Sequence, residues 1–311
     1  MISSAAAFVL RVFSSALHRG SHAMISSRLT PFFFLAPALI GLLVFRLAPI
    51  GIAVAGSLTG TSLMGDLSFV GLENFSYLLS DPEFWSSLQV TLIFNLIINP
   101  LQLAIAFALA LLVFQPGRGI WLYRTLLVLP MAVSTGLSAV LFGLFLDVNL
   151  GPLNGFLEWI GIGAQPFHRG QDQALATLIG IATWKGAGYW MLFLLAGLYS
   201  IPSSVHEAAL MDGATSWQRF RFVTLPLMRK PMAFVLVADT AINFLFFAPV
   251  YILTSGGPSG ATSVLMYQAY LSAFTFSDLG RSLAISTILL AIILVIVALE
   301  LRLLRSPEDR V

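Results

Sequence analysis

The chain has 311 residues, of which 58% are hydrophobic and only 10% charged, and its mean hydropathy is +0.91. A soluble domain carries about 25% charged residues to cover its surface, so this composition excludes an ordinary water-soluble protein and predicts an integral membrane protein. The absence of cysteine excludes a disulfide framework and a thiolate metal site, and the four scattered histidines form no metal-binding pattern. A net charge of +2 argues against a nucleic-acid surface.

The N-terminal segment, residues 1–29, is expected to lie in the cytoplasm. Met24–Ser27 repeats the M-I-S-S of Met1–Ser4, and Gly20–Ala23 between them resembles a vector scar or an upstream start. Residues 1–23 therefore carry none of the functional argument. A signal peptide is the rival interpretation, but the apolar run at Ala5–Leu10 is short for one and arginines follow it.

Six segments are apolar over enough residues to cross the hydrocarbon core, which takes about 20 residues as a helix. We expect spans at roughly 31–56, 88–114, 125–146, 174–198, 231–253 and 283–304. Several contain proline, which helices in lipid tolerate when neighbouring groups take up the freed carbonyls. The predicted fold is an all-α membrane protein, a bundle of about six transmembrane helices over residues 30–304 with a short cytoplasmic tail at 305–311.

The distribution of lysine and arginine predicts the orientation, because cytoplasmic loops accumulate both residues. With the N-terminus inside, twelve of the 16 basic residues fall on the cytoplasmic side. They are Arg11, Arg19, Arg28, Arg118, Arg124, Arg219, Arg221, Arg229, Lys230, Arg302, Arg305 and Arg310. Both termini are therefore expected in the cytoplasm. The long outer loops at 57–87 and 147–173 are acidic, which fits either contact with an external partner or simple solvation.

The loop between the fourth and fifth spans, residues 200–230, has the signals of two short helices. Ser204 and Glu207 stand in the S-x-x-E spacing of a capping box, and Thr215 with Gln218 offers a second box. Gly213 between them supplies a left-handed turn. The loop is therefore predicted to be a rigid helix–turn–helix on the cytoplasmic side, and its aromatic residues favour a docking surface or an anchor at the membrane interface.

The residues of this loop carry a resemblance to a known family. The pattern is Glu207-Ala208-Ala209, then Gly213 after three residues, then Val223 and the pair Leu225-Pro226, with valine where the family usually has isoleucine. It resembles the EAA loop of ABC importer permeases. The resemblance implies that the loop forms coupling helices that dock on a cytoplasmic ATPase subunit. The docking residues would be Glu207, Ala208, Ala209, Asp212, Gly213, Leu225 and Pro226. A purely structural role is the alternative to docking, since Glu207 could serve only as a helix cap and Gly213 only as a turn residue.

Other stretches resemble carbohydrate permeases of the maltose and glycerol-phosphate type. They are F-V-G-L-E-N-F at 69–75, D-P-E-F-W at 81–85, R-T-L-L-V-L-P at 124–130, L-A-G-L-Y-S-I-P at 195–202 and L-T-S-G-G-P at 253–258. The resemblance implies a bacterial or archaeal inner-membrane permease for a sugar-like solute. The implied partners are a second permease, forming a heterodimer, a cytoplasmic ATPase dimer and an extracytoplasmic solute-binding protein. This chain would bind no cofactor and perform no catalysis, because no phosphate-binding loop of the G-x-x-x-x-G-K-[ST] type is present; ATP and Mg²⁺ would be held by the ATPase subunits.

Charged residues inside predicted spans are candidate functional residues, because a charge in lipid is costly unless it faces protein or water. We identify three, namely Arg46, Lys185 and Asp239. Arg46 is expected to reach outward to the interface. Lys185 and Asp239 fit either an ion pair between spans or a solute pathway.

The polar residues of span two allow a similar choice. Asn95, Asn99 and Gln102 lie along one face, where interhelical hydrogen bonds are a more frequent role than solute recognition. The candidate solute pathway is Asn95, Asn99, Lys185, Tyr189, Asp239, Asn243 and Phe247. The resemblance also leaves open that the partner permease makes most solute contacts.

Two alternative functions come from other classes. A stand-alone secondary transporter or channel coupled to an ion gradient would use Asp239 as its ion site and would show inverted repeats, which we do not detect in the sequence. A membrane scaffold without transport activity is disfavoured by charges at membrane depth.

Overall fold

The structure is a computed structural model that describes residues 30–60 and 68–304. The part of the chain that it describes is helical, with one isolated bridge between Thr59 and Phe69. The predicted N-terminal segment, residues 1–29, and the predicted tail, residues 305–311, lie outside the described residues, so these domain boundaries stay predictions. The chain divides into two compact units, before and after residues 53–54, and each is described by itself.

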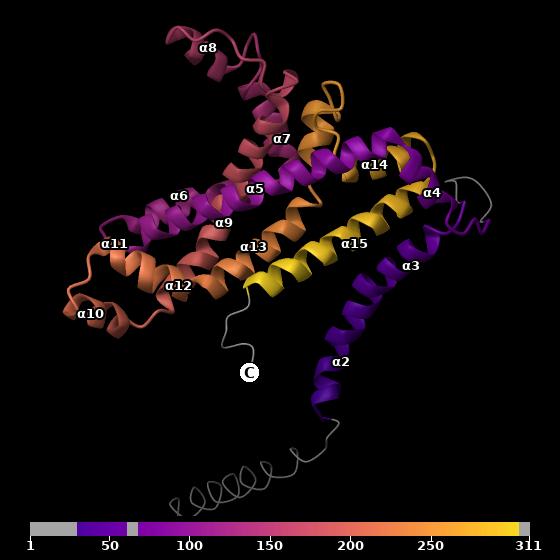
Figure 1. Ribbon diagram of the computed structural model, residues 1–311. Helices are drawn as coiled ribbons and strands as arrows, with labels where there is room; N and C mark the ends of the chain where they lie inside the picture. Colours follow the sequence, from indigo (N-terminus) through magenta and orange to yellow (C-terminus); the bar gives the residue numbers. More distant parts are fainter. Residues whose placement is uncertain (1–29, 61–67, 305–311) are drawn as a thin grey trace, which may run out of the picture. The chain divides into compact units, whose positions relative to one another are not determined.

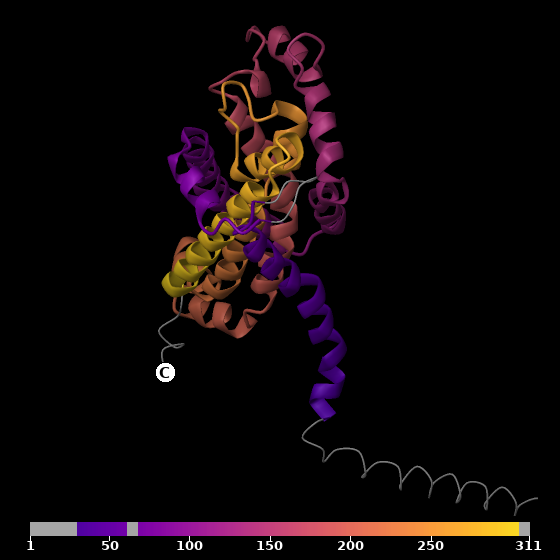
Figure 2. The same ribbon diagram turned by 90° about the vertical axis from the view of Figure 1, so that its right-hand side faces the viewer.

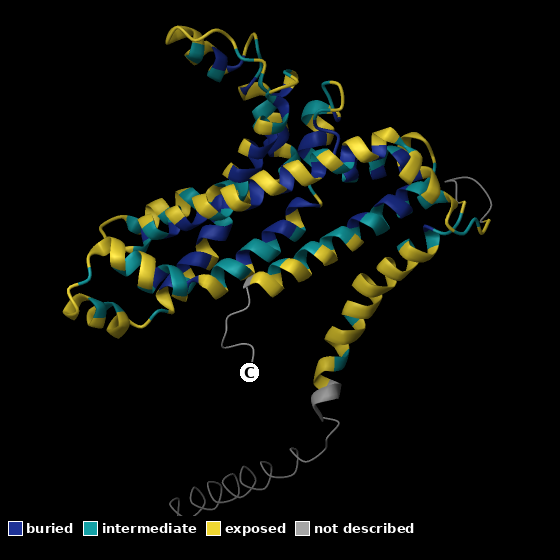
Figure 3. Ribbon diagram, viewed as in Figure 1, coloured by how far each residue is buried: buried dark blue, intermediate teal, exposed yellow. Residues whose placement is uncertain are grey.

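The first unit contains α2 (Thr30–Leu42), a π-helical turn at Leu43–Leu47 and the start of α3 (Ala48–Gly56). None of the residues from Leu43 to Gly56 is buried, and Figure 3 shows the exposed surface continuing along these helices. An apolar helix with no buried face is one whose solvent is lipid or whose partner is another chain. Arg46 lies in the π-helical turn with its side chain exposed, and its reach to the membrane interface stays a prediction.

The second unit is built around four longer helices, α5 (Pro82–Phe114), α9 (Ala174–Tyr199), α13 (Arg229–Asn243) and α15 (Leu279–Leu304). Shorter helices connect them: α4 (Glu73–Ser80), α6 (Ile120–Ala132), α7 (Thr135–Phe145), α8 (Pro152–Trp159), α10 (Ser203–Met211), α11 (Ser216–Arg219), α12 (Leu225–Leu227) and α14 (Leu265–Tyr270). α9 packs along α5, and α13 packs against both α5 and α15 (Figures 1 and 2).

The core lies between these helices in three clusters. Met191 and Leu194 of α9 meet Ala106 of α5 in the first cluster, and Phe94 and Leu178 join the same two helices in another. The third joins α4, α14 and α15. Outside the core the surface remains apolar, as Leu96 on α5 is 77% exposed. This arrangement, with apolar residues both inside and outside, is typical of a helix bundle in lipid.

The six expected spans are confirmed only in part. Four helices are long and apolar enough to cross a membrane: Phe34–Gly56, Pro82–Phe114, Ala174–Tyr199 and Leu279–Leu303. A fifth crossing is possible if α6 and α7 count as one broken span, because a 98° bend separates them. The expected span at 231–253 is interrupted, since α13 ends at Asn243 and a new π-helical turn begins only at Val250. The described residues therefore provide four or five spans by length and composition.

Candidate functional site

Lys185 provides a hydrogen-bond donor for a free backbone carbonyl at the break between α6 and α7. Its ammonium group donates a hydrogen bond to the carbonyl of Val133, directly after the last residue of α6. Carbonyls at a helix end have no partner within the helix, and a cation there is favoured by the helix dipole. Ser134 caps the start of α7 by accepting from the Leu137 amide, so both helix ends at the bend have a partner. Lys185 thus helps to hold the broken pair to α9.

Asp239 lies in α13 and is 1% exposed. Its Oδ1 accepts a hydrogen bond of 2.6 Å from the indole nitrogen of Trp190, whereas Oδ2 is buried without a hydrogen-bond partner. No ion pair joins Lys185 to Asp239, so the simpler of the two expectations for these residues is wrong. The cause is the break in α6, which offers Lys185 a carbonyl of its own.

A network of amides joins α5 to α13 beside Asp239. Asn243 donates to Asn99 at 2.8 Å and to Gln102 at 3.3 Å, and Asn99 donates to Thr240 at 2.9 Å. Gln102 also donates to the Ala182 carbonyl of α9. Buried amides paired in this way hold helices together in lipid, which is the role that the sequence favoured for span two.

A cavity of about 210 Å³ brings most of the candidate pathway residues together. Lys185 and Tyr189 line it from α9, and Asp239 and Asn243 line it from α13. Gln102, Met131, Thr135 and Trp190 complete much of its wall. The cavity therefore presents a cation, a carboxylate, amides and aromatic rings in one small space. This is the set of groups that recognises hydroxyl-bearing ligands.

Three candidate residues lie elsewhere. Asn99 does not line the cavity but accepts a hydrogen bond from Asn243, which does. Asn95 donates to the Thr91 carbonyl of its own helix and leaves its buried Oδ1 unpartnered. Phe247 packs its ring 5.5 Å from Tyr251 and 5.1 Å from Tyr270, measured between ring centroids. Of the seven predicted pathway residues, four line one cavity and three do not.

Glu300 was missed as an intramembrane charge. It lies in α15, within the expected last span, and accepts a hydrogen bond of 2.9 Å from Thr240, next in sequence to Asp239. Its other carboxylate oxygen is buried without a partner. The signal that could have revealed it is a lone glutamate in the apolar run L-V-I-V-A-L-E-L-R-L-L, four residues before the end of the expected span at 304. The hydrogen bonds of Thr240 link Glu300 to Asn99 and hence to the cavity wall.

The 200–230 loop is helical throughout most of its length. α10 begins at Ser203 and is capped without any side chain, so the predicted Ser204–Glu207 box is wrong: Ser204 lies inside the helix. The reason is Pro202, whose fixed φ suits the residue before a helix and moves the start two residues earlier, from Val205 to Ser203. The Thr215–Gln218 box is confirmed by hydrogen bonds in both directions. Gly213 has φ +76°, the left-handed turn that the sequence predicted.

The residues of the EAA pattern lie on the surface of this loop. Glu207, Ala208, Asp212 and Gly213 are exposed, Ala209 is half-buried, and no residue of α10 is buried. Leu225 and Pro226 are half-buried in α12 at the other end of the loop. Met211 is 88% and Trp217 64% exposed. Apolar side chains on a helical loop rigid enough to hold them are typical of a protein docking surface.

In the loop at 147–173, the charged side chains of Asp147 and Arg169 bind partners within the loop itself. The Asp147 carboxylate accepts from the backbone amides of Asn149 and Leu150 and pairs with Arg169 at 3.0 Å. These hydrogen bonds, followed by the nearby guanidinium, hold the pKa of Asp147 below its usual value. Asn154 is buried and bridges Asp147 to Gln165. Asp147 is therefore part of the loop's own structure.

Comparison with known proteins places the chain among transport proteins. A family model described as "Binding-protein-dependent transport system inner membrane component" matches residues 1–306. The sn-glycerol-3-phosphate transport system permease protein UgpA of Brucella abortus is 36% identical over 278 residues, covering 89% of this chain and 94% of the relative. The sulfoquinovosyl glycerol transport system permease protein SmoG of Agrobacterium fabrum is 30% identical over 286 residues, covering 91% and 93%.

Two solved structures share the fold. A bacterial ABC transporter involved in the import of the acidic polysaccharide alginate matches with a TM-score of 0.72 at 23% identity, over 88% of this chain and 94% of that chain. The same kind of transporter, in complex with an alginate pentasaccharide-bound periplasmic protein, matches with a TM-score of 0.75 at 23% identity, over 90% and 94%. The chain belongs to the family of binding-protein-dependent transport system inner membrane components, and it has the fold of an ABC importer permease.

Proposed function

We propose that this chain forms, with a second permease, the membrane pathway of an ABC importer for a sugar or sugar-like solute. The observation that carries the proposal is the cavity between α9, α13 and α5, where Lys185, Tyr189, Asp239 and Asn243 meet. Polar groups at membrane depth are costly, and here they line an internal space beside two breaks in the helices. Discontinuous helices next to a polar cavity are a common way to build a solute site in a transporter.

The proposed pathway also includes an aromatic shelf, made of Phe247, Tyr251 and Tyr270. Their ring centroids lie 4.9–5.5 Å apart, and the hydroxyls of the two tyrosines are 3.3 Å apart. Such a shelf can stack on the apolar face of a sugar while amides and charged groups bind its hydroxyls. Permeases for sn-glycerol 3-phosphate and sulfoquinovosyl glycerol are among the relatives, and both solutes carry hydroxyls and an anionic group. Lys185 is the cation in the cavity wall that suits an anionic group.

The 200–230 loop is the proposed docking surface for a cytoplasmic ATPase. This assignment places both termini and the loop in the cytoplasm and the 147–173 loop outside, facing an extracytoplasmic binding protein. Glu207, Ala208, Ala209, Asp212 and Gly213 would contact the ATPase, with Leu225 and Pro226 joining the loop to α13. A turn fixed at Gly213 and a capped α11 support it, because a rigid loop transmits a displacement that a flexible one would absorb.

The test is solute uptake into vesicles that hold the whole transporter. Asp239→Leu removes the carboxylate from the cavity, while Asp239→Asn keeps an acceptor for Trp190. We expect Asp239→Leu to assemble with its partners and to lose ATP-dependent uptake, with sn-glycerol 3-phosphate and maltose as the first solutes. Gly180→Ala, at a position where an added Cβ meets nothing within 4 Å, is the control and should import normally. Uptake that persists without ATP and follows an ion gradient would contradict the proposal and favour a secondary transporter.

A further inference from the structure

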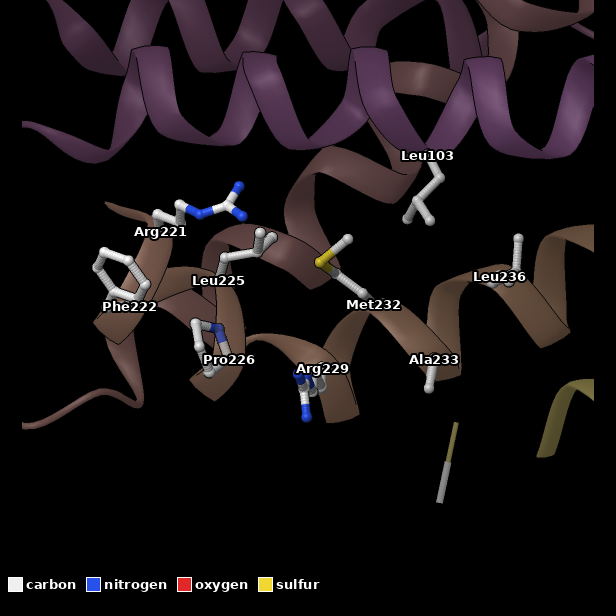
Figure 4. Close-up of a pocket in the computed structure, with 9 residues that line it drawn as sticks. All are labelled: Leu103, Arg221, Phe222, Leu225, Pro226, Arg229, Met232, Ala233 and Leu236. Atoms are coloured by element: carbon white, nitrogen blue, oxygen red, sulfur yellow. The ribbon is translucent and has the colours of Figure 1, made fainter. Parts of the chain in front are cut away.

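A groove separate from the cavity lies at the junction of the 200–230 loop with α13. It has a volume of about 440 Å³ and is lined from three elements. Arg221 belongs to the π-helical turn at Phe220–Thr224, Leu225 to α12, and Arg229 and Met232 to the start of α13. Leu103 of α5 faces them from the other side (Figure 4). No residue of the groove belongs to the candidate pathway, and Leu225 and Pro226 are the lining residues that belong to the EAA pattern.

The groove has a charged end and an apolar end. Figure 4 shows Arg221 at one end with its guanidinium toward α5, Leu103 and Leu236 at the other end, and Arg229 between the two ends on the side away from Leu103. Leu103, Met232 and Leu236 are half-buried, so their outer sides are open along the groove. Both arginines are exposed, and no carboxylate among residues 30–60 and 68–304 pairs with either. The groove thus matches a long ligand that is apolar over most of its length and negatively charged at one end.

The position of the groove selects among such ligands. α13 starts at Arg229 and carries the apolar residues Met232, Ala233 and Leu236 in the turns that follow, and Leu103 lies within the long apolar helix α5. The charged end therefore lies where the bundle leaves the hydrocarbon layer, and the apolar end lies inside that layer. Basic residues between helices at this level bind the head groups of anionic lipids, with acyl chains following the apolar side chains. A protein partner would have to bury two guanidinium groups and supply carboxylates to match them.

We propose that this groove binds one anionic phospholipid. Its phosphate lies against Arg221 at the charged end, Arg229 adds positive charge at the edge of the groove, and an acyl chain lies along Leu103, Met232 and Leu236. Since Arg221 belongs to the proposed docking loop and Arg229 to a helix that lines the cavity, the lipid ties the loop to α13. The site would make the stability of that junction depend on the anionic lipid content of the membrane. The inference concerns lipid binding and does not depend on which solute is carried.

The experiment is native mass spectrometry of the transporter, purified through a tag on this chain from nanodiscs holding equal amounts of phosphatidylglycerol and phosphatidylcholine. One arginine near a membrane surface favours an anionic lipid by about fivefold, so we expect wild type to retain phosphatidylglycerol at least about fivefold over phosphatidylcholine. The variant R221Q/R229Q should lose this preference. The control R118Q/R302Q removes two exposed arginines outside the groove and should keep it.

Two results would overturn the proposal. One is retention of both lipids in equal amounts by wild type, and the other is an unchanged preference in R221Q/R229Q. A separate crosslinking measurement distinguishes lipid from protein as the occupant of the groove. Because the chain has no cysteine, Ala233→Cys introduces a single thiol into the chain, and this thiol lies within the groove. A thiol-reactive crosslinker at this position that captures the second permease in the assembled transporter would show that protein covers the groove. Protection from such crosslinking, together with the lipid preference, is the expected result.

Discussion

The 200–230 loop and the membrane cavity are built in opposite ways. In the cavity region polar groups face inward, and Asn99, Asn243 and Asp239 are each less than 10% exposed. In the loop apolar groups face outward, and Met211 is 88% exposed although it sits on an ordered helix. The cavity residues find most of their hydrogen-bond partners within this chain, whereas apolar side chains of the loop stay exposed on it.

The contrast fits the proposed division between a solute site in the cavity and a docking surface on the loop. A buried polar network that is nearly satisfied stabilises the bundle and leaves only a few groups, such as Asp239 Oδ2, for a ligand. An exposed apolar surface on a loop contributes little to the stability of the chain and much to binding. Substitutions in the two regions should therefore separate folding and transport from docking.

The largest effect is expected at Gly188, where α9 approaches α6. A Cβ at Gly188 would lie 1.8 Å from the Leu127 carbonyl oxygen, so Gly188→Ala forces the two helices apart and should cost about 3 kcal/mol or more. The measurement is the yield of monodisperse protein and its thermal unfolding in detergent. Gly180→Ala on the same helix meets nothing within 4 Å and is the matched control. Equal stability of the two variants would contradict the described packing of α6 on α9.

The second-largest effect is expected at Asp239, and it tests whether the cavity acts in transport. Asp239→Leu removes the carboxylate that accepts a hydrogen bond from Trp190. The loss of a hydrogen bond to a charged group costs about 1.5–3 kcal/mol. If Asp239 acts in transport, this cost corresponds to a roughly tenfold to hundredfold lower uptake rate. Asp239→Asn keeps the acceptor, so comparing the initial uptake rates of the two variants separates the hydrogen bond from the charge. If both variants import at the wild-type rate, the cavity is structural and the pathway lies elsewhere.

Gly213 tests the rigidity of the loop. Its φ of +76° strains any residue with a branched side chain, so Gly213→Val should cost roughly 1–2 kcal/mol in the turn. Its surroundings are open, so the strain comes from the backbone alone. Solute-stimulated ATP hydrolysis of the purified transporter should fall in Gly213→Val and be largely retained in Gly213→Asn, because asparagine tolerates this conformation. Equal activity of the two variants would mean that the turn does not transmit motion.

The smallest effect separates the two capping predictions. Thr215→Ala removes a side chain that accepts from the Gln218 amide and should destabilise α11 by about 1 kcal/mol. Ser204→Ala should change α10 by less than about 0.5 kcal/mol, since Ser204 caps nothing. Hydrogen exchange of the loop amides measures both. Faster exchange in Ser204→Ala than in Thr215→Ala would reverse the assignment of the caps.

Much of the fold follows from the sequence, and the exceptions have physical causes. Apolar length predicted α5, α9 and α15, because a helix of about 20 apolar residues is strongly specified by the need to satisfy its backbone in lipid. The same criterion failed at residues 125–146 and 231–253, where a bend and an interruption divide an apolar run. Apolar length does not reveal such breaks: at the first, the distant Lys185 binds the free Val133 carbonyl, and at the second, local hydrogen bonds of Phe244, Leu245 and Phe246 hold the turn.

The candidate site shows the same limit. Lys185 and Asp239 were recognisable as charges at membrane depth, but their partners were not, because the Val133 carbonyl and the Trp190 indole become available only in the folded bundle. Tyr189 and Asn243 were correctly grouped with them by helical spacing. Phe247 was not, because the helix that would have carried it onto the same face ends at Asn243.

The most direct test of the central claim is co-purification with the chain after a single exposed side chain is changed. Met211→Asp places a charge on the loop, and Leu150→Asp places one at a position of nearly equal exposure, 89% against 88%, in another loop. Neither change disturbs the core. We predict that a P-loop ATPase and a second permease co-purify with wild type and with Leu150→Asp, and that Met211→Asp loses the ATPase while keeping the permease. Undiminished capture of the ATPase by Met211→Asp, or purification of a chain that transports alone, would contradict the account.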